Sequence, residues 1–316
     1  MASDHIILGE GENCIFSTDP SITGVTNNLC VVGGAGSGKT MSILESRLLE
    51  AYHSNLLVTV TKRRVVEKYT PLLQKRGYEI LDLNFSHPEK GNIGYDPMTF
   101  ISSYQDITAL ATAIVLANPR KERTTADPYW DDAGISLLSS EIGFIKMTQD
   151  RATFADVLDF HSKLVFEESD GQIVTNYDEQ FACLAKRAPS CFVVNCWKTF
   201  KNLPIRTASC VYSSLNTTLD STFTPEIRKL FRKRSVDMDA FASKKTILFL
   251  TTSAVNRSHH CITTLFYTQT FGRLFEFAED QPNGTLPIPV EVVADDFATG
   301  CPIPLFDEFI SIFREI

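Results

Sequence analysis

The stretch GGAGSGKT at positions 33–40 constrains the fold of this chain more than any other feature. It follows an apolar run at positions 29–32 and leads into a helix-like segment at 39–54. In a phosphate-binding loop with this Gly-x4-Gly-Lys-Thr spacing, backbone N–H groups surround a phosphate, and the next helix directs its positive end at the same anion. The sequence therefore predicts a strand over 29–32 that runs into a nucleotide-binding loop. A chance glycine-rich turn is the alternative interpretation.

The predicted loop gives its residue types separate roles. The glycines permit the tight turn because they tolerate backbone conformations that other residues avoid. Lys39 is expected to reach the β- and γ-phosphates, and Thr40 is expected to give its hydroxyl group to Mg²⁺. The predicted nucleotide-binding residues are Gly33, Gly34, Ala35, Gly36, Ser37, Gly38, Lys39 and Thr40.

Apolar runs of strand length alternate with helical patterns on both sides of the middle of the chain. Further strands are expected over 55–61, 78–85, 244–253 and 288–298, and helices over 39–54, 63–77 and 259–280. Strands that alternate with helices indicate a parallel sheet, whose loops after each strand gather at one edge. The predicted class is α/β, with a mainly parallel central sheet flanked by helices and closed from both ends of the chain.

The middle of the chain shows a different pattern, which is helical throughout. Four helices are expected over 106–118, 130–147, 153–166 and 177–188, with Thr153 and Asp156 placed to cap the third. The sequence therefore predicts an inserted all-α subdomain. The expected division is 1–105 for the first part of the nucleotide-binding domain, 106–197 for the insert and 198–316 for the second part.

A second polar motif lies in the strand segment expected over 288–298. Asp295 comes at the end of that strand, where phosphate-loop enzymes place the acid that orients the magnesium shell. Its neighbour Asp296 is a candidate general base for the attacking water. The alternative is an ordinary solvated strand end with two acids.

Composition limits the other classes of function. A formal net charge of −8 argues against a protein that coats nucleic acid over its whole surface. Two basic runs remain as local DNA contacts or as solvated helix faces: the first basic run (Lys62, Arg63, Arg64 and Lys68, diluted by Glu67) and the second basic run (Arg228, Lys229, Arg232, Lys233 and Arg234).

Cysteine spacing and hydropathy exclude further classes. The eight cysteines form no C-x-x-C pairs, which argues against a zinc knuckle or a disulfide framework. No apolar stretch has the roughly 18 to 20 residues that a membrane span needs, and the N-terminal segment carries acids where a signal peptide carries Lys or Arg. The expected location is the cytoplasm.

Taken together, these motifs resemble the type IV coupling proteins, the TraG-like ATPases of bacterial conjugation and type IV secretion. The resemblance covers most of the chain and extends well beyond the phosphate loop. It is carried by NNLCVVGGAGSGKT, GYEILDLNFSHPEKGNIGYDPMTFI, DPYWDDAGISLL, FYTQTFGRLFEFA and PIPVEVVADDFATGCPIPLFDEFISIFRE.

The resemblance implies a RecA-like motor that binds ATP and Mg²⁺ and assembles as a homo-hexamer. It also implies single- or double-stranded DNA and a relaxase or relaxosome as partners, delivered to type IV secretion channel proteins at the cytoplasmic face of the cell membrane. By match, Gly33, Gly38, Lys39 and Thr40 take the Walker A roles and Asp295 the magnesium role. Arg257, just beyond the strand at 244–253, is a candidate arginine finger, with an ordinary exposed loop arginine as the alternative.

The chain also departs from the pattern of this family. Asp296 stands where the family usually has Glu, so its carboxylate reaches about 1.5 Å less far. The family's Asp-Pro-Lys-Gly-Glu after the second strand is here the segment 60–64, and its Asn-Ile-Gly after the magnesium acid is 299–301. Most members of the family begin with membrane helices, which this sequence does not show, and because the match stops at Ile316 we expect a motor truncated at its C-terminal end.

Two functions remain open from the sequence. The first is a coupling-type ATPase whose hydrolysis of ATP moves DNA. The second is an adaptor or hydrolysis-deficient remnant that binds nucleotide without mechanical work, which the departures at Asp296 and at 60–64 favour. The intact set of Lys39, Thr40 and Asp295 favours the first.

Overall fold

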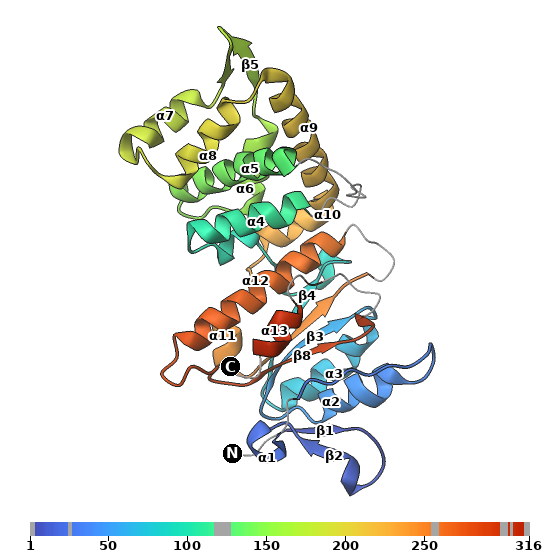
Figure 1. Cartoon of the computed structure of the whole chain (residues 1–316). Coiled ribbons are helices and arrows are strands. Elements are labelled where there is room, and N and C mark those ends of the chain that lie inside the picture. Colours follow the sequence, from blue (N-terminus) through green and yellow to red (C-terminus); the bar gives the residue numbers. More distant parts are fainter. Residues whose placement is uncertain are drawn as a thin grey trace. The chain divides into compact units, whose positions relative to one another are not determined.

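A computed structural model describes residues 4–24, 27–116, 128–253, 259–297, 303 and 306–312 of the chain. The chain divides into two compact units (Figure 1). The α/β unit comprises Met1–Gly94 and Val236–Ile316, and the helical unit comprises Tyr95–Ser235. The expected insert of 106–197 lies within this helical unit, which begins before residue 106 and continues past residue 197.

A four-stranded parallel sheet forms the centre of the α/β unit. Its strands are β3 (Asn55–Val60), β4 (Glu79–Asn84), β7 (Thr246–Thr251) and β8 (Val290–Ala294), in the order β4-β7-β3-β8. Strand β3 from the N-terminal half lies between two strands from the C-terminal half, so both ends of the chain close one sheet (Figure 1). This confirms the predicted mainly parallel sheet.

The strand predicted over 29–32 is wrong. Residues 27–34 form no strand, and Leu29, Val31 and Val32 are exposed. A strand needs a neighbour to satisfy its backbone hydrogen bonds, and within the described part of the chain β8 pairs only with β3. The apolar run before the phosphate loop therefore pairs with no described strand.

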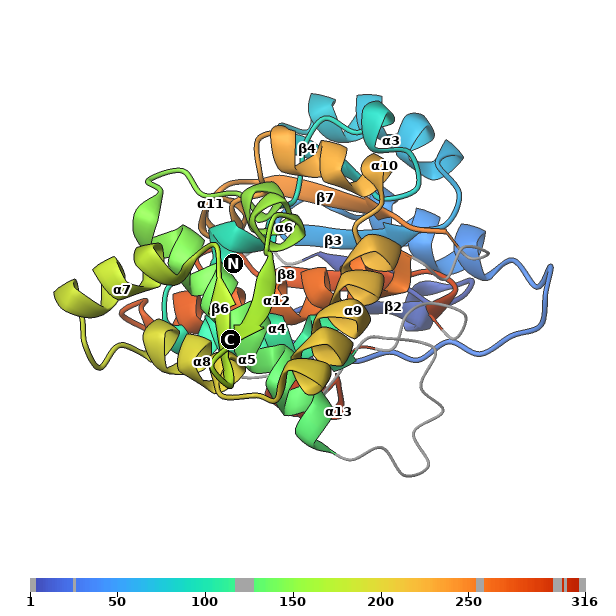
Figure 2. The same cartoon turned by 90° about the horizontal axis from the view of Figure 1, so that it is seen from above.

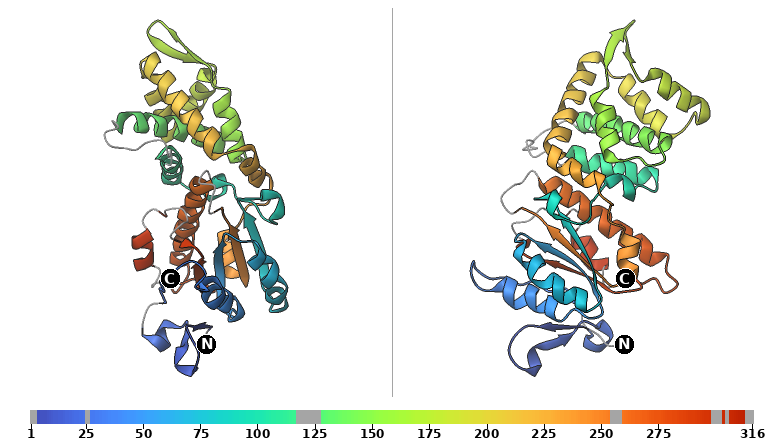
Figure 3. Two further views of the ribbon diagram at one scale, coloured as in Figure 1. Left: turned by 90° about the vertical axis from the view of Figure 1, so that its right-hand side faces the viewer. Right: turned by 180° about the vertical axis from the view of Figure 1, so that it is seen from behind.

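Helices cover both faces of the sheet (Figure 3). One face carries η2 (Thr40–Glu45), α2 (Ser46–Leu49) and α3 (Arg64–Lys75), and the other carries α11 (Met238–Ser243), α12 (His260–Glu279) and α13 (Phe306–Ile312). The result is the three-layer arrangement that buries a parallel sheet on both sides.

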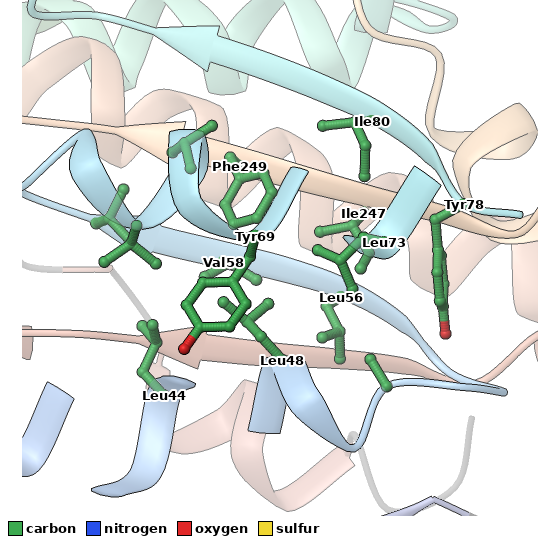
Figure 4. Packing of buried hydrophobic residues seen from close by; sticks show 14 residues of the cluster. Leu44, Leu48, Leu56, Val58, Tyr69, Leu73, Tyr78, Ile80, Ile247 and Phe249 are labelled. Carbon is green, nitrogen blue, oxygen red and sulfur yellow. The ribbon is translucent and has the colours of Figure 1, made fainter. Parts of the chain in front are cut away.

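The apolar stripe of α3 explains its position on the sheet. Val65, Val66, Tyr69 and Leu73 recur at helical spacing and are all buried. They pack with Leu44 and Leu48 of the preceding helical segment and with residues of β3 and β7 in one cluster (Figure 4). This core fixes the helix that follows the phosphate loop against the sheet.

The N-terminal residues form a small addition to the α/β unit. Strands β1 (His5–Ile7) and β2 (Ile15–Ser17) pair antiparallel around η1 (Glu12–Cys14), and α1 (Pro20–Thr23) follows. Among the described residues, no helix of either unit is long and apolar enough to cross a membrane.

The helical unit is built around α5 (Pro128–Thr148), which packs against α4, α6, α8 and α9 (Figures 1 and 2). The surrounding helices and turns are η4 (Pro97–Phe100), α4 (Tyr104–Leu116), α6 (Phe154–Ser162), α7 (Asp178–Arg187), α8 (Phe192–Lys201), α9 (Ile205–Thr222), α10 (Pro225–Arg228) and η5 (Lys229–Arg232). Thr153 and Asp156 form the predicted capping box of α6.

The helical unit also contains a β-hairpin that sequence analysis did not predict. Strands β5 (Phe166–Ser169) and β6 (Gln172–Thr175) pair antiparallel across a two-residue turn. Asp170 and Gly171 both have positive φ, as a type I′ hairpin turn requires. Helix α6 therefore ends at Ser162 instead of continuing to 166.

Candidate nucleotide-binding site

The predicted phosphate loop forms a tight turn before η2. Gly36 and Gly38 have φ angles of 77° and 84°, a region that favours glycine. The ammonium group of Lys39 donates to the carbonyl oxygens of Gly33 and Gly34, at 2.5 and 3.0 Å, and so folds back over its own loop. Most of the loop is exposed, which leaves its backbone accessible to a ligand.

The loop and the end of β8 come together although they are far apart in the sequence. The hydroxyl group of Thr40 donates to the two carboxylate oxygens of Asp295, at 2.8 and 3.1 Å. Asp295 is held in place because its backbone N–H donates to the carbonyl of Thr59 in β3. A hydroxyl and a carboxylate are oxygen donors of the kind that Mg²⁺ prefers, so this pair fits the ion.

Asp296 lies at the same edge of the sheet, where it contacts Thr61, the residue that follows β3. The hydroxyl group of Thr61 donates to Asp296 Oδ2 at 3.3 Å. Asp296 adopts φ 53°, a left-handed conformation that Asp tolerates better than longer side chains. Its exposed carboxylate is accessible to a water molecule.

Other predicted site residues lie outside the described part of the chain. They are Arg257, the candidate arginine finger, and the segment 299–301 after the second acid. Elsewhere, no group of three or more His, Cys, Asp or Glu residues among the described positions could hold a metal ion on its own. A magnesium ion held by Thr40 and Asp295 would take its remaining ligands from water or from a nucleotide.

A buried arginine network joins the segments that carry the site. Sequence analysis did not predict it. Arg47 on α2 donates to both carboxylate oxygens of Glu291 on β8, at 2.6 and 2.7 Å, and to Asp4 at 2.9 Å. Asp4 also accepts the backbone N–H groups of Tyr52, His53 and Ser54. The network ties the helix after the phosphate loop to β8, the strand that directly precedes Asp295.

Burial and pairing oppose each other in this network. Burial favours the neutral carboxyl of Asp4, but the N–H of Ser54 and the guanidinium of Arg47 outweigh it and hold the pKa of Asp4 below its usual value. Burial likewise disfavours the Arg47 cation, yet Glu291 and Asp4 raise its pKa. The sequence did offer a signal, because Glu291 interrupts an otherwise apolar strand.

Two of the four cations in the first basic run, Arg63 and Lys68, are paired with carboxylates within the α/β unit. Arg63 makes a bidentate ion pair with Asp82, at 2.6 and 3.1 Å. Lys68 contacts Glu45 of η2 at 2.5 Å, and this hydrogen bond, with that from Tyr69, lowers the pKa of Glu45. These two ion pairs join α3 and the segment just before it to β4 and to η2.

The comparison with protein families gives one match over nearly the whole chain. A family model described as type IV secretory system conjugative DNA transfer matches residues 4–315. No curated protein matches the chain.

Solved structures share the fold at low sequence identity. The bacterial conjugative coupling protein TrwBdeltaN70, in a trigonal form with sulphate, aligns with a TM-score of 0.50 and 13% identity over 83% of this chain and 61% of that one. The plasmid coupling protein TrwB with the ATP analogue ADPNP aligns with a TM-score of 0.48 and 12% identity over the same shares. TrwB with ADP and Mg²⁺ gives equal values. The chain thus spans about three fifths of the length of these structures.

Proposed function

The chain belongs to the type IV secretory system conjugative DNA transfer family, and on this premise we propose that it is an ATP-dependent coupling protein. In this proposal it binds ATP with Mg²⁺ and uses hydrolysis to deliver DNA, with its bound relaxase, to a type IV secretion channel. Solved TrwB structures contain ADPNP or ADP with Mg²⁺, so nucleotide and magnesium binding occur among coupling proteins.

One observation carries the proposal more than any other: Thr40 and Asp295 meet at hydrogen-bond distance. They come from a glycine-rich turn and from a strand end 255 residues away. A magnesium ion bound with nucleotide needs both oxygens on one side, and this fold already provides them.

The residues of the site have separable tasks in this mechanism. The N–H groups of the loop bind the β-phosphate, and Lys39 exchanges its two loop carbonyls for phosphate oxygens. Thr40 and Asp295 hold Mg²⁺, which neutralises negative charge on the phosphates when bound. Asp296 accepts a proton from the attacking water at a carboxylate oxygen, and Thr61 orients that carboxylate.

A matched set of variants tests the proposal. We expect the wild-type chain to hydrolyse ATP faster in the presence of DNA, and Lys39→Ala to abolish hydrolysis because the phosphate contact is lost. Lys163→Ala, an exposed lysine of the helical unit, is the control and should keep wild-type turnover. Nucleotide binding without turnover in the wild type, with or without DNA, would instead indicate the adaptor.

Asp296→Glu distinguishes the ATPase from the adaptor more finely. If the shorter side chain only detunes a working site, the longer one should raise the turnover rate. A strained left-handed position works against this gain, because Glu tolerates φ 53° less well than Asp. No change in an already inactive chain would favour the adaptor.

The proposal extends to assembly. We propose that the chain forms a homo-hexamer around its DNA and that Arg257 reaches the nucleotide of a neighbouring subunit. Sedimentation with and without ATP and DNA tests this step. A chain that remains monomeric under all these conditions would contradict it.

A further inference from the structure

The second basic run, residues 228–234, carries the densest positive charge in the chain. Its seven residues include five Lys and Arg and no acid. The run begins at the end of α10, continues through η5 and closes the helical unit. From the sequence alone, this run is either a DNA contact or an ordinary solvated helix face. The surroundings of its side chains in the structure distinguish the two interpretations.

Apolar residues between the cations anchor this segment to the core. Ile227 and Leu230 are fully buried. The ring of Phe231 packs edge-on against Phe154, with centroids 6.0 Å apart. Because a 3-10 helix has three residues per turn, Lys229 and Arg232 of η5 lie on one side of it. The backbone thus presents its charges in a fixed arrangement.

Three of the five cations have no partner within the structure as described. The side chains of Lys229, Arg232 and Arg234 are exposed and make no hydrogen bond or ion pair with any described residue. Arg228, in contrast, donates to the carbonyl of Phe223 at 2.8 Å and lies 3.5 Å from Asp220. The acids that flank the run are Asp220, Glu226 and Asp237, and Asp237 accepts the N–H of Ala240.

In the first basic run two of the four cations are paired, whereas the side chains of Lys62 and Arg64 are exposed and make no hydrogen bond or ion pair with a described residue. Arg63 and Lys68 are paired with carboxylates inside the α/β unit. The charge of the surrounding unit differs as well. Residues 95–235 hold sixteen Lys and Arg against seventeen Asp and Glu, whereas the rest of the chain holds fourteen against twenty-one. A polyanion is therefore repelled least by the unit that carries the second run.

We propose that Lys229, Arg232 and Arg234 bind the phosphate backbone of DNA without reading its sequence. This inference rests on the proposed function for the choice of DNA as the polyanion. Lysine and arginine bind phosphate by charge, and each neutralised phosphate releases condensed counterions. The logarithm of the DNA affinity falls linearly with the logarithm of the salt concentration. Removing three such contacts should make this slope shallower by about 2.7 for double-stranded DNA and by about 2 for single strands.

The test compares two variants of equal charge. The first is Lys229→Gln with Arg232→Gln and Arg234→Gln. The control is Lys163→Gln with Lys186→Gln and Lys198→Gln, three exposed lysines of the same unit that also lack a described partner. Fluorescence anisotropy measures the binding of labelled single- and double-stranded oligonucleotides from 50 to 200 mM salt, and thermal melts confirm that both variants fold.

We expect the wild type and the control to lose about 40-fold more affinity for double-stranded DNA over this salt range than the first variant does. Equal slopes for all three chains would overturn the proposal, as would an equal loss in the control. Wild-type binding to vesicles with 30% phosphatidylserine, but to no DNA, would also overturn it in favour of a membrane surface.

Nucleotide titration keeps this inference separate from the proposed function. If ATP gives no heat with the wild type but DNA binding depends on the three cations, the proposed ATPase fails and the DNA surface stands. If the wild type binds and hydrolyses ATP but DNA affinity does not depend on the three cations, the proposed DNA surface is wrong and the proposed ATPase is retained.

Discussion

The two units both bury charged groups, but they use them differently. In the α/β unit, Arg47 joins two carboxylates from separate segments, and one of them lies on β8, the strand that directly precedes Asp295. In the helical unit, the fully buried Glu141 and His161 pair at 2.9 Å, while Nε2 of His161 has no described hydrogen-bond partner. Burial opposes the His161 cation, and Glu141 outweighs it and raises the pKa of His161.

This difference indicates which buried charged groups should affect the proposed site and which should affect stability alone. If the charges buried in the α/β unit position the proposed nucleotide site, changing them should alter both stability and nucleotide binding. Polar groups buried in the helical unit hold helices together, so changing them should alter stability alone. The predictions below test this separation.

The largest effect is expected from Arg47→Met. The change leaves Asp4 buried and Glu291 half-buried without their cation, which costs about 3–5 kcal/mol of stability. Urea unfolding measures this cost. Weaker binding of ATP by the folded fraction should accompany it, because the helix after the phosphate loop loses its tie to β8. Arg64→Met, an exposed arginine of the same unit, should change neither quantity.

A pH-dependent effect of about 3 kcal/mol is expected at Asp96 of the helical unit. Burial raises the pKa of Asp96 from 3.8 to about 6, although the N–H groups of Met98 and Phe154 donate to it. Because the folded-state pKa is the higher one, folding favours the protonated acid, and stability falls as pH rises from about 4 to 6. Asp96→Asn keeps the acceptor and should remove this slope in urea unfolding, without changing ATP affinity.

A packing change in α5 should cost about 1–3 kcal/mol. A Cβ atom on Gly143 would lie 2.3 Å from Cγ2 of Val193 in α8, so Gly143→Ala forces the two helices apart. Gly134→Ala is the matched control in the same helix, since its Cβ would meet Val115 at an ordinary 3.7 Å. If Gly143→Ala weakened ATP binding as much as it lowered the melting temperature, the proposed separation of the units would break.

The smallest effect is expected from Thr61→Val at the edge of the sheet. It removes an exposed hydrogen bond of 3.3 Å to Asp296, so turnover should fall by about tenfold or less while ATP affinity stays constant. Thr61→Ser restores the hydroxyl and should restore turnover. An unchanged rate in Thr61→Val would show that Asp296 does not need this partner.

Sequence patterns predicted the parts of the fold that depend on local periodicity. The helix expected over 63–77 and the capping box at Thr153 were predicted from spacing alone, and both are formed. The strand at 29–32 failed because pairing depends on a neighbouring strand, which no local pattern reveals. The hairpin at Asp170 and Gly171 had a signal, the Asp-Gly turn, that the helical periodicity around it obscured.

The sequence predicted the residues of the candidate site but not the contacts that hold them in place. The motifs predicted that Thr40 and Asp295 belong together, and the structure brings them into contact. The contribution of Asp4 depends on a contact with Arg47 across 43 positions, which periodicity does not encode. Only the structure shows that Asp296, which replaces the family's usual Glu, has a left-handed φ angle and accepts a hydrogen bond from Thr61.

Calorimetric titration with ATP, with and without Mg²⁺, tests the central claim most directly. If Thr40 and Asp295 hold the ion beside the phosphate loop, the wild type should bind ATP more tightly with Mg²⁺, and Asp295→Asn should lose most of that gain. Thr40→Ser, which keeps the hydroxyl group, should retain it. Equal affinity with and without Mg²⁺ in the wild type, or a full magnesium effect in Asp295→Asn, would contradict the account.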